Sequence, residues 1–164
     1  KDVAFAEDMS VTGDQRDIQT IDDDEDRFTA VRPMRLNATQ VKASVLRLTG
    51  PERNISTAID RSFRHDPSTP QRDIEGTVQQ ALFLMNNPTL QSKLKSSQLK
   101  KRLLTIEQPR PLITQLYLAI LARRPTDSEF TRGRKHLRSV TNRSEAIDDL
   151  LWVLVNSTEF LTKH

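Results

Sequence analysis

Apolar residues recur at spacings of three and four along most of the chain, the pattern typical of helices that bury one face. The clearest case follows Asn37, which together with Gln40 forms the signature of a helix start. An apolar face continues from there until Gly50 and Pro51, two residues that commonly end helices. The sequence therefore predicts a helix over 38–49.

The same signals predict further helices in the rest of the chain. Asn87 with Pro88, and Thr126 with Glu129, mark two of their starts. We expect these helices from 74 or 77 to 85, and over 88–106, 111–122, 127–140 and 143–156, with a final turn at 157–161; a short helix over 54–61 is left open.

Two of these segments carry a more specific prediction. The segment 88–106 has a lysine-rich middle with Ser96 and Ser97, a point where the helix can break in two. In the helix that ends at residue 85, four apolar residues share one face. These residues, predicted to point inward, are Val78, Ala81, Leu82 and Met85.

Together these patterns predict an all-α fold, a compact helical bundle of five to six helices. No alternating strand pattern occurs beyond the first ~35 residues. Residues 1–35 are predicted to form an extended acidic N-terminal arm or a linker from an upstream domain, and 36–164 a single helical domain. The chain begins at Lys1 with no methionine or signal peptide, so we expect it to be a fragment of a longer protein.

Charge is strongly segregated along the chain. Residues 1–30 contain ten acidic and three basic residues, a net charge of −7, whereas 91–143 contain thirteen basic and three acidic residues, a net charge of +10. We therefore hypothesise that the acidic arm lies against the basic part of the domain. Deletion of residues 1–30 tests this hypothesis, and an unchanged melting temperature at low salt would contradict it.

The composition excludes several kinds of chemistry. The chain has no cysteine, which excludes disulfides, thiolate nucleophiles, thiolate-ligated zinc, iron–sulfur clusters and covalently attached haem. No apolar run approaches the ~18 residues of a membrane-spanning helix. The three histidines, His65, His136 and His164, are far apart in the sequence, so no metal site and no cofactor is predicted.

Two local patterns resemble functional sites without meeting their requirements. The acidic run that begins at Asp22 has Arg27 and Pro33 where a calcium-binding loop requires Gly and Glu. His65 stands beside Asp66 in a proline-flanked loop, and adjacency in sequence does not aim a base at a nucleophile. No catalytic residue is therefore predicted.

The basic segment is the strongest chemical signal in the sequence. Such a surface could neutralise phosphates, anionic lipid headgroups or acidic polysaccharide. Against this interpretation, basic residues are also expected in the last turns of helices, and one Tyr and one Trp make no stacking platform. The candidate anion-binding residues are Lys93, Lys95, Lys100, Lys101, Arg102, Arg123, Arg124, Arg132, Arg134 and Lys135.

Several stretches of sequence resemble a known domain family. They are Arg32–Leu36 (RPMRL) with Leu48–Gly50, Asp66–Pro70 (DPSTP), Gly76–Pro88 (GTVQQALFLMNNP), Leu116–Thr126 (LYLAILARRPT) and Leu150–Leu161 (LLWVLVNSTEFL). From about Phe28 to His164 the chain resembles the C-terminal domain of unknown function, number fifteen-fifty-three, of large planctomycete secreted proteins. Those proteins often carry a cytochrome c-like domain. The resemblance implies an exported parent protein with a helical C-terminal module, and it implies no catalytic residue.

The sequence and the resemblance together predict a non-catalytic helical interaction or structural module from the C-terminal part of a larger exported protein, periplasmic or at the cell surface. Its partners are predicted to be the upstream domains of its own parent protein or another protein. Two alternatives stay open. The basic segment 91–143 could bind a polyanion, nucleic acid or acidic polysaccharide, which a salt titration on heparin or DNA would test. The chain could also be a fragment of an enzyme whose site needs an upstream region, which a deep polar pocket near Asp66–Asp73 and Asn86–Asn87 would favour.

Overall fold

A computed structural model of the chain describes residues 34–64, 68, 70 and 76–163. The arm predicted for residues 1–35 lies outside these residues except for Met34 and Arg35, and so do the acidic run at Asp22 and the His65–Asp66 pair. The contacts within the chain group Pro33–His164 into one compact unit. The description that follows concerns this unit.

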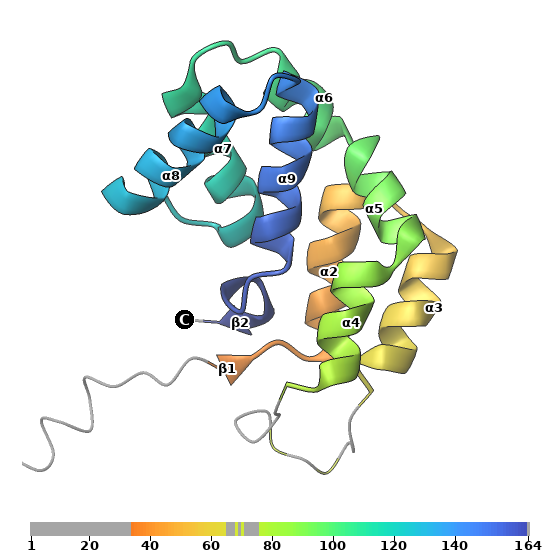
Figure 1. Cartoon of the computed structure of the whole chain (residues 1–164). Coiled ribbons are helices and arrows are strands. Elements are labelled where there is room, and N and C mark those ends of the chain that lie inside the picture. The colour runs from red at the N-terminus through yellow and green to blue at the C-terminus, as the bar shows by residue number, and fades with distance from the viewer. Residues whose placement is uncertain (1–33, 65–67, 69, 71–75, 164) are drawn as a thin grey trace, which may run out of the picture. The chain divides into compact units, whose positions relative to one another are not determined.

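Eight α-helices account for most of the described residues and confirm the predicted all-α class (Figure 1). The prediction of five to six helices is too low, because the short segment near residues 54–61 does form a helix and because 88–106 forms two. None of the helices in the described residues has the length and apolarity that a membrane span requires. The helices are α2 (Ala38–Thr49), α3 (Arg53–Ser62), α4 (Val78–Asn86), α5 (Pro88–Lys95), α6 (Gln98–Leu104), α7 (Pro109–Leu121), α8 (Asp127–Ser139) and α9 (Arg143–Val155), followed by the 3-10 helix η2 (Glu159–Leu161).

Side-chain caps begin several helices at the residues that the sequence indicated. Asn37 Oδ1 accepts a hydrogen bond from the Gln40 backbone N–H at 2.9 Å, and Gln40 Oε1 accepts one from the Asn37 N–H at 3.0 Å, which completes a capping box at α2. Thr126 and Glu129 form the same arrangement at α8. These caps satisfy backbone donors that no turn of the helix can reach, which is why the sequence located both starts correctly.

The break between α5 and α6 has a local cause in two adjacent serines. Ser96 Oγ donates to the Ser92 carbonyl at 3.0 Å at the end of α5. Ser97 Oγ accepts from the Lys100 backbone N–H at 3.1 Å and so caps the start of α6. Serine competes well for such terminal backbone groups, so the pair ends one helix and begins the next.

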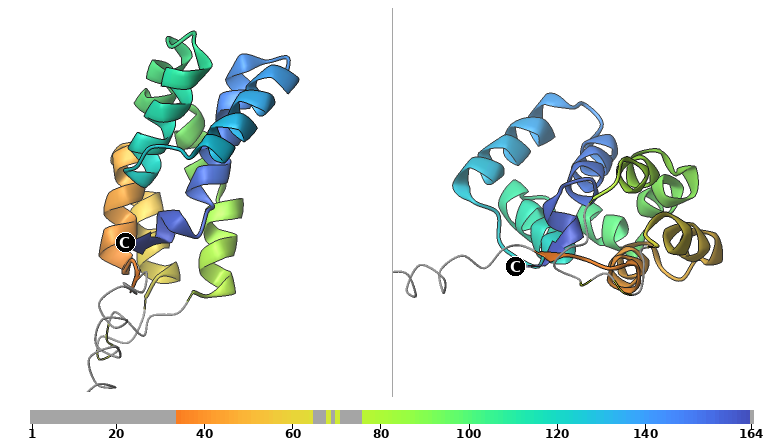
Figure 2. Two further views of the ribbon diagram at one scale, coloured as in Figure 1. Left: turned by 90° about the vertical axis from the view of Figure 1, so that its left-hand side faces the viewer. Right: turned by 90° about the horizontal axis from the view of Figure 1, so that it is seen from below.

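Helix α9 lies in the middle of the unit, with α7 and α8 on one side and α2, α4 and α5 on the other (Figure 1). It packs against α5, α6, α7 and α8. Seen from the side, α4 and α8 lie toward one face of the unit, and α2 and α7 lie toward the opposite face (Figure 2, left). The core is a single cluster whose fully buried members include Val41, Val45, Ile55, Ile59, Leu90, Leu112, Leu116, Ile147 and Leu151.

Helix α4 faces the opposite way from the prediction. Gln80 and Leu84 are buried, and Phe83 packs edge-on against the ring of Phe63, the C-cap residue of α3, with ring centroids 6.1 Å apart. Apolar residues occupy nearly the whole circumference of α4, so periodicity alone cannot select the buried side. The residues that the sequence predicted to point inward are instead exposed: Val78, Ala81, Leu82 and Met85.

A short two-stranded ladder joins the two ends of the described chain. Strand β1 (Met34–Arg35) pairs antiparallel with β2 (Thr162–Lys163), and the Leu36 N–H donates to the Leu161 carbonyl at 2.8 Å. The sequence predicted no strand near residue 162, because two residues are too few to show an alternating pattern.

Candidate functional site

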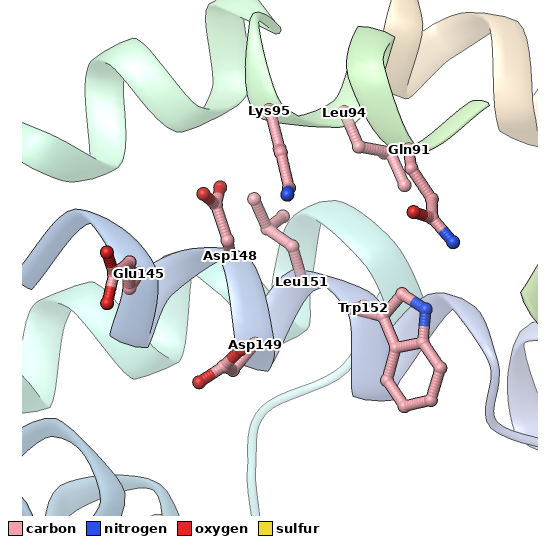
Figure 3. Close-up of a pocket in the computed structure, with 8 residues that line it drawn as sticks. All are labelled: Gln91, Leu94, Lys95, Glu145, Asp148, Asp149, Leu151 and Trp152. Carbon is pink, nitrogen blue, oxygen red and sulfur yellow. The ribbon is translucent and has the colours of Figure 1, made fainter. Parts of the chain in front are cut away.

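A hollow of about 190 Å³ lies between α5 and α9 (Figure 3). Leu94 and Leu151 are buried core residues, whereas the indole of Trp152 is 38% exposed. The hollow therefore combines an apolar base, an aromatic wall and a polar rim. Its residues are Gln91, Leu94 and Lys95 from α5, and Glu145, Asp148, Asp149, Leu151 and Trp152 from α9; below we call it the α5–α9 hollow.

Asp148 is the most enclosed carboxylate of this hollow. Its Oδ2 accepts a hydrogen bond at 2.7 Å from Nζ of Lys100, and both side chains of this ion pair are nearly buried. Its Oδ1 is buried and has no hydrogen-bond partner among the described residues. A buried pair that lost one member would leave an uncompensated charge. The pair therefore fastens α6 to α9 rather than presenting a charge to a ligand.

The other two carboxylates of the hollow are exposed. Nε2 of His136 on α8 lies 3.0 Å from Oδ2 of Asp149, and Nδ2 of Asn142 donates to Oε1 of Glu145 at 3.0 Å. With Lys95 at the rim and Asp148 paired with Lys100, the three carboxylates leave the hollow with a net charge of −1, in a chain whose net charge is +3. Carboxylates beside an aromatic face suit the binding of a cationic group.

The exposed residues of α4 form a second feature, which we call the α4 apolar face: Val78, Ala81, Leu82 and Met85. The three larger side chains are 41% to 74% exposed. The capping box of α4 fixes the orientation, because Gln80 Oε1 accepts from the Thr77 backbone N–H at 3.3 Å. The same Oε1 also accepts from Nη2 of Arg35 at 3.4 Å. With Gln80 held on the inner side, the face around residues 78, 82 and 85 points away from the core.

Hydrogen bonds from side chains to backbone carbonyls link the α4 apolar face with the α5–α9 hollow. Nε2 of Gln91, which lines the hollow, donates to the Met85 carbonyl at 2.6 Å. A second hollow of about 220 Å³ includes Ala81 and Met85 on one side and Asn156 on the other. Nδ2 of Asn156 in turn donates to the Trp152 carbonyl at 2.8 Å. We call the combined surface the docking face.

The groups that line the α5–α9 hollow are carboxylates, an amide, an amine, an indole and two leucines. The residues that line the α5–α9 hollow include no serine, threonine or histidine that could form a nucleophile and its base. Among the described residues, no three His, Cys, Asp or Glu side chains gather closely enough to hold a metal ion. The enzyme alternative requires a polar pocket near Asp66–Asp73 and Asn86–Asn87. Asn87 caps α5 by accepting from the Leu90 N–H at 2.9 Å, and Asp66 and Asp73 lie outside the described residues.

Three of the candidate anion-binding residues are held by carboxylates of the protein itself. Lys100 pairs with Asp148 as described above, and Nζ of Lys93 lies 2.8 Å from Oε2 of Glu52. That hydrogen bond holds the pKa of Glu52 below its usual value. Arg123 binds Glu129 and Glu159 together, so its guanidinium is fully occupied.

The remaining candidate anion-binding residues are distributed over different parts of the unit. Lys95 lines the α5–α9 hollow, and Arg102 lines another hollow formed by α2, α6 and α7. On α8, Nη2 of Arg132 donates to Ser128 Oγ at 3.3 Å, and Arg134 lies over the ring of Phe130 at 5.6 Å. Lys101, Arg124 and Lys135 are exposed, and none of the three forms an ion pair within the described part of the chain. Anion binding by the whole set stays a prediction.

Sequence reasoning did not identify the residues of the docking face as a site. The one Trp was considered only as too little for a stacking platform, and the acidic residues of α9 were not considered. Three carboxylates at 145, 148 and 149 follow helical spacing and could have indicated one polar face. Nothing in the sequence indicates that α5 lies opposite them.

Comparison with known proteins identifies one relationship. Residues 51–137 match the model of a family named PSD1 and described as "Protein of unknown function (DUF1553)". No curated protein and no solved structure matches the chain. The predicted resemblance to domain fifteen-fifty-three is thereby confirmed, while the planctomycete source and the cytochrome c-like domain stay predictions.

Proposed function

This chain belongs to the PSD1 family of proteins of unknown function, and from that premise we propose that it is a non-catalytic interaction module that binds an amphipathic helix of a partner protein. The partner helix carries apolar side chains along one face and a lysine or arginine near one end. The apolar side chains pack on the α4 apolar face, and the cation enters the α5–α9 hollow.

The observation that carries this proposal is the α4 apolar face. Single exposed apolar residues are common on protein surfaces, but a contiguous set along one helix marks an interaction surface. The whole of α4 contains no charged residue, in a chain of which 29% is charged. The exposed side of α4 is therefore less polar than a helix face in contact with water usually is. Within the described residues, no other element covers it.

The chemistry of the partner follows from the other end of the docking face. Glu145 and Asp149 are exposed carboxylates, and Trp152 offers an aromatic face between them and α4. A lysine or arginine placed there gains both charge pairing and a cation–π contact. Glu145 and Asn156, the C-cap of α9, are eleven residue steps apart, about 16 Å at 1.5 Å per residue. A partner helix of about three turns would cover that length.

Two synthetic helical peptides with the same leucine stripe test the proposal, one ending in two lysines and the other in two glutamates. In calorimetric titrations we expect the lysine peptide to bind at least about tenfold more tightly. The double variant Leu82→Asn/Met85→Gln should weaken that binding at least about tenfold. The matched control is Leu104→Asn on α6, an exposed leucine away from the docking face, and it should bind as wild type.

Each result bears on a separate part of the proposal. If the double variant binds the lysine peptide as well as wild type does, α4 is not the docking surface. If both peptides bind equally well, the cation plays no part. All three substitutions replace exposed side chains, so we expect melting temperatures close to that of the wild type.

We further propose that the partner helix belongs to the parent protein and that both are exported, an expectation that the resemblance to C-terminal modules of secreted proteins supports. The rest of the parent protein, produced as a separate chain, should sediment together with the wild-type module and not with Leu82→Asn/Met85→Gln. Sedimentation as separate species would instead indicate that the helix comes from another protein. Cell fractionation of the source organism tests the export.

A further inference from the structure

A third hollow, of about 320 Å³, opens where α2, α6 and α7 meet. Its volume falls within the roughly 300–1,000 Å³ range of small-molecule pockets. Helices α2 and α7 lie toward the face opposite α4 (Figure 2, left), so this hollow is separate from the docking face. It is independent of the proposed function.

The lower part of the hollow is apolar. Leu48, Leu99 and Leu103 belong to the buried core and form its base. Leu118 of α7 is 40% exposed and extends the apolar wall outward. An apolar ligand group that covered these side chains would remove their surface from water, at about 25 cal/mol per Å².

The rim of the hollow carries two arginines from different helices. Arg47 stands in the last turn of α2 and Arg102 in the last turn of α6. Neither guanidinium has an ion-pair or hydrogen-bond partner in the part of the chain that the structure describes. No Asp or Glu is among the described residues that line the hollow. Arg102 is one of the candidate anion-binding residues, whereas Arg47 precedes the basic segment and was not among them.

Helix dipoles alone do not account for this arrangement. A basic residue in the last turn of a helix is stabilised by the carbonyl end of that helix, and this applies to each arginine separately. It does not explain why two arginines of separate helices meet at the rim of the same apolar hollow. Guanidinium groups bind carboxylates and sulfonates through paired N–H donors.

We propose that this hollow binds a small organic anion with an apolar body, such as an alkyl or aromatic carboxylate or sulfonate. The anionic group lies between Arg47 and Arg102, with Gln115 as a further polar contact at the rim. The alkyl or aromatic body covers Leu103 and Leu118. A polyanion backbone fits less well, because it would pair with the arginines and leave the apolar base uncovered.

Octanoate is the probe, and two simpler compounds separate its charge from its apolar chain. Acetate carries the anion without the chain, and octyltrimethylammonium carries the chain with the opposite charge. In NMR titrations of the whole chain we expect saturable binding of octanoate with a dissociation constant below about 1 mM. Acetate should bind at least about tenfold more weakly, and octyltrimethylammonium should show no saturation.

Variants locate the binding to this hollow. Arg47→Gln/Arg102→Gln should weaken octanoate binding at least about tenfold, and Leu118→Asn should also weaken it. Arg134→Gln is the matched control, because Arg134 lies over Phe130 on α8 and does not line the hollow. That variant should bind octanoate as wild type does. Circular dichroism and melting temperatures confirm that each variant is folded.

Several results would overturn the proposal. They are the absence of octanoate binding at millimolar concentration, equal binding of acetate, and octanoate binding unchanged by the double arginine variant. Vesicles with phosphatidylglycerol form the last comparison. Vesicle binding that depends on Arg47 and Arg102 while free octanoate does not bind would assign the site to a membrane surface and overturn the proposal of a free ligand.

Discussion

At the scale of single residues, Arg123 is the best example of a basic residue that serves the fold. Its guanidinium donates to Glu129 at 2.8 and 2.9 Å, reaches Glu159 through both Nε and Nη2, and lies over the ring of Tyr117. Hydrogen bonding to Glu129, and then to Glu159, raises the pKa of Arg123 above its usual value. The same contact with Arg123 lowers the pKa of Glu129 to about 2. Burial raises the pKa of the Tyr117 hydroxyl.

This network predicts a pH-dependent contribution to stability. Glu129→Gln removes the charge but keeps the cap of α8, because a glutamine oxygen can still accept from the Thr126 N–H. At pH 7 we expect the variant to lose about 1 kcal/mol of unfolding free energy, a value already reduced for solvent screening of these partly exposed groups. Urea denaturation of both proteins measures the difference.

The sign of the pH dependence follows from the lowered pKa of Glu129. The folded-state pKa of about 2 lies below the usual value of 4.5, so the carboxylate contributes its full stabilisation above about pH 4.5. That contribution falls as the pH drops from 4.5 toward 2. Wild type and Glu129→Gln should therefore converge in stability over this interval. A difference that stays constant down to pH 2 would show that the ion pair contributes little.

At the scale of elements, helix starts were predictable and helix orientation was not. A cap such as Asn37 or Thr126 acts on the next three residues, so the sequence contains all the information that fixes it. The buried side of α4 depends instead on Phe63 of another helix and on the contact of Gln80 with Arg35. Such contacts link residues far apart in the chain, and periodicity cannot reveal them when a helix is apolar all round.

The same dependence on tertiary contacts applies to the binding surfaces. Arg102 and Lys95 were identified as candidates from their charge alone, but they line separate hollows. Arg47 and Trp152 each line a hollow only because other helices pack beside them. Sequence reasoning therefore named some of the residues at each hollow and could not group them.

The contact between α7 and α8 gives a prediction at this scale. A Cβ atom added to Gly133 of α8 would lie 3.1 Å from Cδ1 of Ile113, a fully buried side chain of α7. Gly133→Ala gains about 1 kcal/mol in helix propensity but overcrowds that contact. We expect a net loss of about 0.5–1 kcal/mol in wild type. In an Ile113→Val background, which lacks Cδ1, the same substitution should be stabilising by a similar amount.

A double-mutant cycle of unfolding free energies measures this coupling. The four proteins are wild type, Gly133→Ala, Ile113→Val and the double variant. Gly133→Ala could instead change the unfolding free energy equally in both backgrounds. That result would show that crowding against Ile113 does not determine the effect of the substitution.

At the scale of the whole molecule, the basic residues that are concentrated in one part of the sequence belong to five helices and the loops between them. The basic segment 91–143 runs from α5 to the start of α9, and some of its side chains make contacts within the protein. Arg143, for example, lies exposed at the start of α9 and donates to the carbonyls of Ile106 and Glu107. Binding of a polyanion by the basic segment 91–143 therefore stays a prediction, which the salt titration on heparin or DNA tests.

The last prediction concerns the boundaries of the folded unit. The core cluster runs from Val41 to Leu161, and β1 with β2 joins the two ends of the unit. We expect residues 33–164, produced alone, to unfold in one cooperative transition. A shorter chain over 37–164 loses β1 and the hydrogen bond from Leu36 to Leu161, and its melting temperature should be about 3–5 °C lower, as a loss of about 1 kcal/mol implies.

Calorimetry of the two truncated chains and of the whole chain decides between the possible boundaries. Equal melting temperatures for 33–164 and 37–164 would show that the ladder of β1 and β2 does not contribute to the stability of the unit. The whole chain compared with 33–164 at low salt tests the hypothesis of an acidic arm on a basic domain. Charge attraction across such a contact would raise the melting temperature of the whole chain at low salt, and the difference would shrink as added salt screens it.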